Sequence, residues 1–545
     1  MKKLSFLLTA SLIFSFAQVE ACTSLLAGRN ATTDGSTFIT YSADSHTLYG
    51  ALPYFPAATY PKGTLLDITD WDTGKPLGSI AQVERTYAVI GHMNEYQVSV
   101  TESTWGGRPE LQDTTGVVDY GSLMYIALQR SRTAREAIKV MTDLVKKYGY
   151  NSTGESFSIA DPNEVWIMEM IGKGPHNKGA VWVAVRIPDD CISAHANHSR
   201  IHTFPLDDKE NCMYSPDVIS FAREKGYFNG LNKDFSFSNA YAPADFGALR
   251  ACEARVWSFF RKYNKNMDSY LSYIKGESKT PIPLYIKPDR KLSVQDMKNG
   301  MRDHFEGTPF DMTQDIGAGP FKSPYRFRPM TFKVDGQEYV MERAIATQQT
   351  GFTLVAQMRS WLPDAIGGVL WFGVDDANTC IYVPIYCCTT EVPECFSPDN
   401  GSLLKLSWTS AFWVHNWVAN MAYDRYNLMI EDIRPVQEQI ETDFNTMQPI
   451  IDKAATEMYK NDKTAAIRFL TAYSVAQAQQ TTARWKDLGE YLLVKYLDGN
   501  RKKEKDGKFM LNPYGKPESP DFPGYSEEYY RAVAKDAGDR LKVTF

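Results

Sequence analysis

Two blocks of β-prone sequence, separated by a long irregular stretch and followed by a helical tail, constrain most strongly how this chain folds. In both blocks, short runs rich in β-branched and aromatic residues alternate with turn residues such as those at 32–35. The first block has runs at 23–27, 36–41, 87–90, 96–100, 157–160, 165–170 and 181–187, and the second at 344–348, 352–358, 368–373 and 380–386. Strands in two separate blocks favour two sheets.

Helical patterns lie within the first block and between the two blocks. Thr133 and Glu136 have the spacing of a capping box, and an apolar stripe at helical spacing follows them until Gly149, a natural helix end. Further helical pieces fall around 246–262, inside a stretch from about 205 to 335 that is rich in charge, proline and glycine. We expect this stretch to be an insertion.

The tail from about 402 has long helical segments with few glycines. We expect Pro435 and Pro449 to break these helices, and Gly499 to close the last one. Two sheets sandwiched between helices would satisfy this order of elements, which is a layered α+β architecture. We therefore expect one large domain over 22–400, which contains the insertion, and a helical C-terminal region over 401–545 packed on it.

The first residues are typical of an export signal. Lys2 and Lys3 precede an apolar run at 4–16, and Val19-Glu20-Ala21 supplies small residues at the −3 and −1 positions of a cleavage site. The run is shorter than the ~20 apolar residues of a membrane span. Residues 1–21 are thus predicted to be a signal peptide, and the mature protein to be periplasmic or extracellular, without a membrane span.

Composition narrows the classes of partner. The formal net charge is −6 and no long basic run occurs, so nucleic acid is a poor partner. Export permits disulfides, and the cysteines clustered at 380–395 could hold one bridge. No CxxC pair exists, which disfavours zinc. The chain has eight cysteines, at 22, 191, 212, 252, 380, 387, 388 and 395.

Cys22 directly follows the predicted cleavage site. A thiol is a strong nucleophile only as the thiolate, and an N-terminal cysteine carries its own base, because the α-amino group titrates near pH ~8. Two other interpretations stay open. Lipoproteins are acylated on a cysteine at this position, although Val19 and the bulky, charged Glu20 fit the lipid-attachment motif poorly. Cys22 could also belong to a disulfide.

The residues that follow Cys22 carry a resemblance. The stretch at 22–36, CTSLLAGRNATTDGS, resembles the start of the dipeptidase A/secernin family of cysteine peptidases. These are N-terminal-nucleophile hydrolases, distantly related to choloylglycine (bile-salt) hydrolases and penicillin V acylase. Four further stretches fit the same family in order, at 41–45, 91–102, 161–172 and 191–197. The resemblance implies a four-layer αββα N-terminal-nucleophile fold with a helical C-terminal extension, and no cofactor.

The resemblance also implies roles for individual residues. Cys22 matches the nucleophile, and Asp44 matches the carboxylate that fixes the terminal amine and thiol. Asn197 matches the side-chain amide of the oxyanion hole. A backbone N–H near Thr104, at the end of the hairpin that begins at Asn94, is expected to be the second donor. The structural alternative for Asp44 is an aspartate that caps a turn, and the alternative for Asn197 is an ordinary loop asparagine.

Two positions concern charge near the thiol. Arg255 matches the family's late arginine, which favours the thiolate, while a salt bridge on a helix surface is its alternative. Tyr41 stands where these relatives usually have arginine, three residues before the key aspartate. Tyrosine carries no fixed charge at neutral pH, so thiolate stabilisation or recognition of a substrate carboxylate falls to another group.

Histidines 195, 198 and 202 lie at i, i+3 and i+7, which would suit a metal site on a helix. The segment has the pattern of strand and turn instead, so one shared face is not assured. The family needs no metal, and we assign none. His92 is expected to pack in the hairpin rather than act as an acid.

The leading hypothesis is an exported cysteine dipeptidase that hydrolyses dipeptides through an acyl-enzyme on Cys22. The first alternative is an acylase or amidase of the same fold that acts on N-acyl amides, which Tyr41 keeps open. The second is a non-enzymatic surface lipoprotein that binds peptides or glycans. Whether the chain forms a homo-oligomer is left open by the sequence.

Overall fold

The structure is a computed structural model that describes residues 22–543. The predicted signal peptide at 1–21 lies outside the described residues. Helices and sheets both contribute to the fold, which confirms the α+β class predicted from the sequence. Within residues 22–543, every helix is too short or too polar to span a lipid bilayer.

Two antiparallel sheets form the centre of the described chain. Over residues 22–543, the first sheet has seven strands in the order β16-β14-β1-β2-β19-β20-β21. The first β-prone block supplies β1 and β2, and the second supplies β19 to β21, so strands from both ends of the domain share one sheet. These strands are β1 (Ser24–Ala27), β2 (Thr37–Asp44), β14 (Ile192–His195), β16 (Tyr285–Ile286), β19 (Thr350–Met358), β20 (Val369–Val374) and β21 (Val383–Tyr386).

The second sheet has eight strands in the described chain, in the order β15-β13-β12-β11-β10-β9-β8-β3. They are β3 (Tyr54–Phe55), β8 (Val89–Ile90), β9 (Met93–Asn94), β10 (Ser99–Trp105), β11 (Gly154–Ala160), β12 (Val165–Gly172), β13 (Ala180–Ile187) and β15 (Cys212–Tyr214). Small two-stranded ribbons are β4 (Ala58–Thr59) with β7 (Arg85–Thr86), β5 (Leu65–Thr69) with β6 (Pro76–Ala81), β17 (Thr331–Val334) with β18 (Gln337–Val340), and β22 (Glu504–Lys505) with β23 (Lys508–Phe509).

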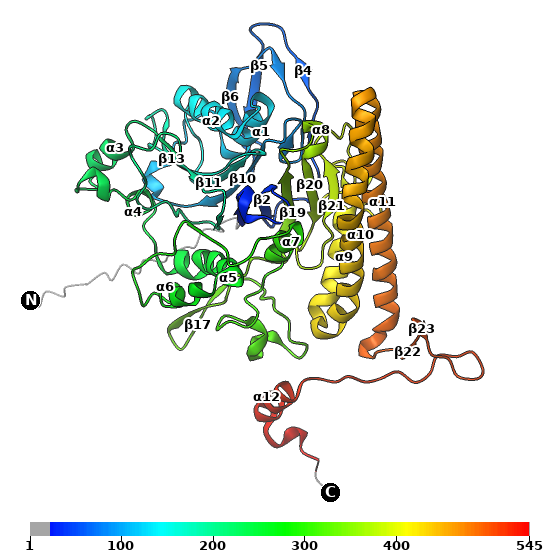
Figure 1. Cartoon of the computed structure of the whole chain (residues 1–545). Helices are drawn as coiled ribbons and strands as arrows, with labels where there is room; N and C mark the ends of the chain where they lie inside the picture. The colour runs from blue at the N-terminus through cyan, green and yellow to red at the C-terminus, as the bar shows by residue number, and fades with distance from the viewer. Residues whose placement is uncertain (1–21, 544–545) are drawn as a thin grey trace, which may run out of the picture.

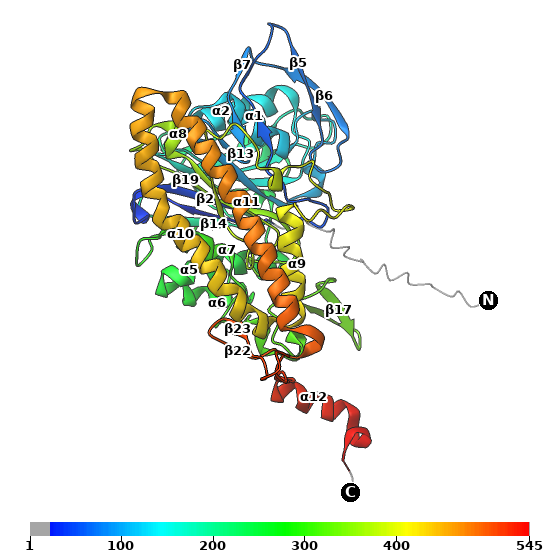
Figure 2. The same cartoon turned by 90° about the vertical axis from the view of Figure 1, so that its right-hand side faces the viewer.

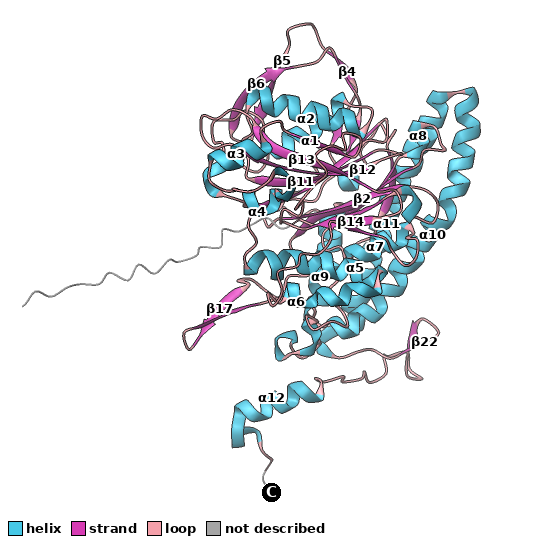
Figure 3. Cartoon of the chain, turned by 60° about the vertical axis from the view of Figure 1, so that its left-hand side comes forward, coloured by secondary structure: helices cyan, strands magenta, loops and turns pink. Residues whose placement is uncertain are grey.

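The two sheets lie face to face and carry helices on their outer sides (Figure 3). β2 of the first sheet contacts β10, β11 and β12 of the second. On the far side of the second sheet lie α1 (Tyr120–Arg130) and α2 (Ala134–Tyr148). The first sheet is covered by α5 (Ala254–Tyr263), α7 (Val294–Met301), α9 (Ala411–Asp424), α10 (Tyr426–Asn461) and α11 (Lys463–Lys495). The remaining α-helices of residues 22–543 are α3 (Val218–Glu224), α4 (Phe237–Tyr241), α6 (Leu271–Ile274), α8 (Asp364–Gly367) and α12 (Glu527–Ala537).

The helix predicted after Thr133 is α2, and its ends follow from the sequence. The Thr133 side chain accepts a hydrogen bond from the Glu136 N–H, while the Glu136 carboxylate reaches back to the N–H of Arg132. Gly149 ends the helix at φ 82°, a backbone conformation that glycine adopts without strain. Met141 and Val145, on its apolar stripe, pack into the core between α1, α2 and the second sheet.

The helical tail folds as a hairpin of long helices, and α9, α10 and α11 cover the edge of the first sheet at β20 and β21 (Figures 1 and 2). Our expectation that Pro435 and Pro449 break these helices is wrong, because α10 runs through both. Both prolines lie on the exposed face, where water can bond the carbonyls that they leave without an N–H partner. The opposite face is held by buried side chains such as Ile433 and Phe444.

The strand predicted at 344–348 is also not formed, and this segment is an irregular loop. Arg343 gives the reason, because its guanidinium donates to the carbonyl oxygens of Ala344 and Ile345 and so replaces a neighbouring strand as their partner. The N–H of Ala346 donates to the carbonyl of Asp303 at 3.1 Å. This loop leads directly into β19.

The cysteine cluster at 380–395 does not form the bridge that the sequence allowed. All eight cysteines lie within residues 22–543, and none of them is in a disulfide. The thiols point to separate backbone oxygens: Cys380 Sγ donates to Ala377 O, and Cys387 Sγ donates to Asp364 O. These buried thiols therefore act as small core side chains.

Candidate functional site

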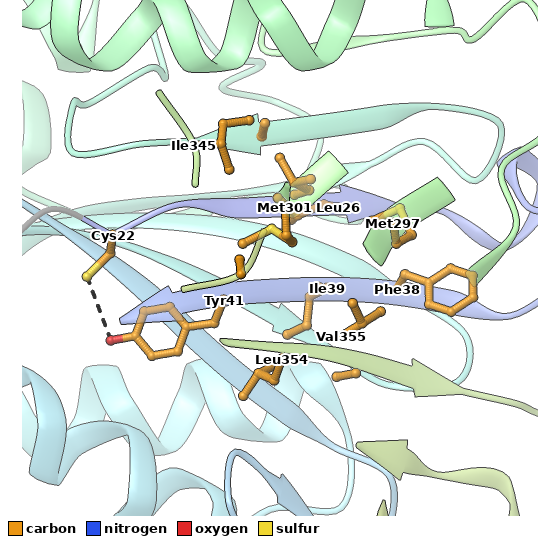
Figure 4. Close-up of a cluster of buried hydrophobic side chains, with 14 of the residues drawn as sticks. Cys22, Leu26, Phe38, Ile39, Tyr41, Met297, Met301, Ile345, Leu354 and Val355 are labelled. Atoms are coloured by element: carbon orange, nitrogen blue, oxygen red, sulfur yellow. Dashed lines mark hydrogen bonds between the residues drawn. The ribbon is translucent and has the colours of Figure 1, made fainter. Parts of the chain in front are cut away.

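Cys22 lies two residues before β1, an inner strand of the first sheet, and it is buried at 4% exposure. Its side chain lines a cavity of about 90 Å³, together with Tyr41 and Asp44 from β2 and Glu102 from β10. Figure 4 shows Cys22 at the end of a hydrophobic cluster formed by strands of the first sheet and α7, with its sulfur directed at the Tyr41 hydroxyl. The packed strands thus hold the thiol at the wall of an open space.

The thiol makes two polar contacts. Cys22 Sγ lies 3.4 Å from Glu102 Oε1 and 3.9 Å from the Tyr41 hydroxyl. The Tyr41 hydroxyl in turn donates to Glu102 Oε1, and Thr104 Oγ1 donates to Glu102 Oε2 at 3.3 Å. Tyr41 therefore lies beside the thiol and orients a carboxylate there.

The electrostatic environment favours the neutral thiol. Burial raises the pKa of Cys22 well above its ordinary value, and the negative charges of Glu102 and Asp44 raise it further. Burial also raises the pKa of Glu102, and burial next to Glu102 raises the pKa of Glu155. A proton acceptor is consequently needed before this sulfur can act as a nucleophile.

Asp44 ends β2 with no exposed surface, and its carboxylate is held from several sides. Arg343 donates to Oδ2 at 2.5 Å, Ser42 donates to the same oxygen at 3.1 Å, and Thr350 donates to Oδ1 at 2.7 Å. Arg343 also lines a neighbouring cavity of about 110 Å³. The Asp44–Arg343 ion pair therefore lies between two cavities.

Arg255 ties the backbone of the cysteine to Asn197. It follows one turn of π-helix (Ala248–Glu253), a distortion often found at functional sites, and is 1% exposed. Its guanidinium donates to Cys22 O at 2.7 Å, Thr23 Oγ1 at 2.8 Å and Asn197 Oδ1 at 2.9 Å. Burial lowers the pKa of Arg255 to about 10, and the positive charge of Arg343 contributes to this shift. Arg255 remains a cation at neutral pH.

The orientation of the Asn197 amide follows from these contacts. Because Oδ1 accepts from Arg255, the amide nitrogen must point the other way, and Nδ2 donates to Thr104 O at 2.6 Å. Asn197 has φ 57°, a left-handed conformation that asparagine tolerates better than most residues. Its donor group is thus fixed at the Thr104 carbonyl.

Asn94 lies apart from this group. Its side chain is fully buried in the β9–β10 hairpin, where Nδ2 donates to Leu128 O and Ser131 O and Oδ1 accepts from two backbone N–H groups. It does not line the cavity that contains Cys22. Asn94 sets the geometry of the hairpin and reaches the site only through β10.

The histidines are spread over separate contacts. His195 lies between the hydroxyls of Ser103 and Ser158, at 2.6 and 2.7 Å. His202 contacts Ser236, and His92 contacts the Val100 carbonyl and the Tyr125 hydroxyl. Residues 22–543 contain no cluster of three or more His, Cys, Asp or Glu side chains that could hold a metal.

Comparison with known proteins shows which family has this sequence. The model of peptidase family C69 matches residues 48–439, which is well over half of the chain. This chain belongs to peptidase family C69. The match includes Glu102, Asn197, Arg255 and Arg343 and begins after Cys22, so the nucleophile assignment depends on the geometry and on the 22–36 stretch.

Curated relatives of this C69 chain are named as dipeptidases. A probable dipeptidase of Latilactobacillus sakei is 26% identical over 84% of this chain and 91% of its own length. A probable dipeptidase of Salmonella dublin is 26% identical over 71% of this chain and 85% of its own. Dipeptidase A of Lactobacillus helveticus is 23% identical over 75% of this chain and 83% of its own length. The resemblance found in the sequence is confirmed, and so is membership of a peptidase family.

Three residues of the C69 site have no assigned role in the sequence analysis. Glu102 closes the 91–102 stretch, and its position on a β-strand between two hydroxyl residues marks it as a buried carboxylate. Asp72 comes from the turn between β5 and β6, where an acidic residue is ordinary. Arg343 follows the β17–β18 ribbon, and no local pattern connects it to Asp44.

Proposed function

We propose that this C69 peptidase is an exported cysteine dipeptidase whose nucleophile is Cys22, with its fold of the four-layer αββα N-terminal-nucleophile type. One observation carries the proposal: Cys22 and Asp44 line one cavity, while Arg255 bonds both the Cys22 carbonyl and the Asn197 side chain. The dipeptidase names of the relatives support the substrate class.

The chemistry begins with removal of residues 1–21, which would give Cys22 a free α-amine. The raised pKa of the thiol means that a base has to take its proton, and the α-amine is held only a few ångströms from the sulfur by covalent structure. The sulfur then forms a bond to the peptide carbonyl carbon, and the carbonyl π electrons move to oxygen. Asp44 would fix the amine and thiol during this step.

The oxyanion is the next group to be stabilised. The Asn197 amide, fixed by Arg255, and a backbone N–H near Thr104 are the proposed donors. One such donor is typically worth about 3 kcal/mol in the transition state. The protonated α-amine then gives its proton to the leaving amine as the C–N bond breaks, which leaves a thioester. Water, deprotonated by the α-amine, attacks the thioester and releases the acid and the Cys22 thiol.

A substrate panel tests this function. The mature protein and its Cys22→Ala variant would be assayed with dipeptides, tripeptides and N-acyl amino acids. We expect dipeptides to be hydrolysed by the wild type and not by the variant. Preferential hydrolysis of N-acyl amino acids would replace the dipeptidase by the acylase alternative. Absence of any hydrolysis, with a lipid on Cys22, would favour the lipoprotein.

A further inference from the structure

The cavity of about 110 Å³ on the other side of the Asp44–Arg343 ion pair has three arginines in its wall. They are Arg326, Arg328 and Arg343, and Glu342 is the carboxylate that lines the cavity with them. We call this space the arginine cavity. Because its wall contains more cations than anions, it stabilises a bound anion and disfavours a cation.

Most of these charges are paired within the protein. Arg326 Nη2 donates to Asp315 Oδ1 at 2.8 Å, and Glu342 Oε2 accepts from Arg250 Nε at 2.9 Å. Arg343 is paired with a carboxylate in the same way, through the ion pair described above. The charge that these pairs leave over is that of Arg328.

Arg328 takes part in none of the salt bridges found within residues 22–543. Its Nε and Nη2 both donate to Gln349 Oε1, which is a neutral amide oxygen, while Nη1 makes no hydrogen bond in this part of the chain. Partial burial lowers the pKa of Arg328 and the positive charge of Arg343 lowers it further, while the negative charge of Asp44 acts in the opposite direction. An anion beside both guanidiniums would relieve their repulsion.

The rest of the wall suits an anion as well. His46 lines the cavity, and burial together with the charge of Arg328 lowers the pKa of this histidine below 6.5, so its ring is a neutral hydrogen-bonding group at pH 7. Apolar side chains, among them Met312 and Met330, complete the lining. Apolar walls strengthen the attraction between a guanidinium and an anion, because they lower the effective dielectric constant.

The arginine cavity is separate from the cavity that contains Cys22. The two have no lining residue in common, and the buried Asp44–Arg343 pair lies between them. In a dipeptide attacked by Cys22, three bonds separate the attacked carbon from the terminal carboxyl carbon, which keeps the two within about 4 Å. A second molecule, not the dipeptide, is therefore the ligand that fits the arginine cavity.

We infer that the arginine cavity binds a small oxyanion, such as phosphate or a carboxylate, through the Arg328 guanidinium. The planar fork of N–H groups in a guanidinium matches the oxygens of both kinds of anion. Gln349 connects this site with Asp44, because its Oε1 accepts from Arg328 and its Nε2 donates to Asp44 O at 3.2 Å. A bound anion would thus hold the loop at 343–349 against the end of β2.

The test measures binding of inorganic phosphate and of acetate to the mature protein by isothermal titration calorimetry, with sodium chloride at equal ionic strength as the reference. We expect at least one of the two oxyanions to bind more tightly than chloride. Arg328→Gln should weaken this binding about 10-fold, the scale of a charged hydrogen bond. Arg328→Lys keeps the charge but loses the fork, so it should weaken binding less.

The control variant is Arg132→Gln. Arg132 is an exposed arginine whose Nε donates to the Tyr87 hydroxyl at 2.9 Å, and it does not line the arginine cavity. Its affinity for the oxyanion should equal that of the wild type. Circular dichroism of each variant checks that the fold is retained.

Three results would overturn the inference. Equal affinities for phosphate, acetate and chloride would show only general screening, and unchanged affinity in Arg328→Gln would place the anion elsewhere. An oxyanion that competes with a dipeptide for the wild type would belong to the Cys22 cavity. A protein that binds the oxyanion through Arg328 and hydrolyses no peptide would support this inference and refute the proposed function.

Discussion

The Arg343 guanidinium donates to the Asp44 carboxylate at 2.5 Å and so joins two residues that lie 299 positions apart. The side chains of Arg343 and Asp44 are 8% and 0% exposed. Asp44 ends a strand that runs beside Cys22, whereas Arg343 belongs to the loop before β19. The ion pair therefore fastens the second β-prone block to the strand that carries the proposed site.

Breaking this pair should destabilise the protein. We expect Arg343→Met to lower the free energy of unfolding by about 3–5 kcal/mol, because it leaves Asp44 as a buried charge without its cation. Adding Asp44→Asn should recover part of this loss. Urea denaturation of the single and double variants measures the coupling.

The matched control for that cycle is Arg290→Met. Arg290 pairs with Asp296 at 2.7 Å, but its side chain is 58% exposed, so the expected cost is about 0–1 kcal/mol. Equal costs for Arg343→Met and Arg290→Met, or strictly additive effects in the Asp44–Arg343 cycle, would show that the buried pair does not hold the site.

Glu102 should control the ionisation of the nucleophile. Burial is the main cause of the raised pKa of the Cys22 thiol, and the Glu102 carboxylate is the next. Glu102→Gln removes that negative charge, so the pKa of the thiol should fall, and alkylation of Cys22 by iodoacetamide should reach its plateau at lower pH. Mass spectrometry of the labelled peptide measures this.

Glu95→Gln is the control for the alkylation experiment. Glu95 lies in the same hairpin, where it accepts from the Ala88 N–H, and it does not line the cavity. The pH profile of this variant should match that of the wild type. A profile of Glu102→Gln that moves to higher pH would contradict the electrostatic account of the site.

The pair of Arg302 and Glu441 predicts how stability depends on pH. Burial raises the pKa of Glu441, but Arg302 and Lys298 more than offset this and hold it at about 2. Since its ordinary pKa is about 4.5, the folded state gains stability above pH ~4.5 and loses it as the pH falls towards ~2. Glu441→Gln should therefore lower stability at pH 7 by about 3 kcal/mol and flatten its decline across that window.

Acid unfolding followed by circular dichroism measures the effect of Glu441→Gln. The exposed Glu457, which pairs with Lys460 on the surface of α10, supplies the control variant Glu457→Gln, with little expected change. A Glu441→Gln protein with the same stability at pH 7 and the same acid transition as the wild type would refute the stabilising role of the Arg302–Glu441 pair.

Retaining residues before Cys22 should silence the enzyme. In an uncleaved chain the nitrogen of Cys22 is part of an amide and cannot accept the proton of a thiol whose pKa is raised. A variant blocked at the cleavage site should thus show no turnover of a dipeptide that the mature enzyme hydrolyses. Full activity of the blocked form would show that another group is the base.

Sequence patterns predicted the local elements well. The capping residues of α2 and most strands of both blocks are determined by residues close together in the chain, and these predictions are confirmed. The prolines of α10 misled us, because a proline on an exposed helix face costs less than one in the interior. The loop at 344–348 has β-prone residues, yet the Arg343 side chain satisfies its carbonyls.

Some residues of the candidate site could be predicted from the sequence and others could not. Residues in the quoted stretches, such as Cys22, Asp44 and Asn197, lie on or next to β1, β2 and β14, which are neighbouring strands of the first sheet. Arg343 and Asp72 come from a loop and a hairpin turn, where no periodic pattern specifies a partner. Their place at the site depends on tertiary contacts over long separations, which one sequence does not display.

The intact mass of the exported protein tests the central claim most directly. The account predicts a chain that begins at Cys22 with an unmodified amine and thiol, because both groups are needed for the chemistry. A mass that retains residues before Cys22, or one that carries a diacylglyceryl group on it, would contradict the assignment of Cys22 as an N-terminal nucleophile.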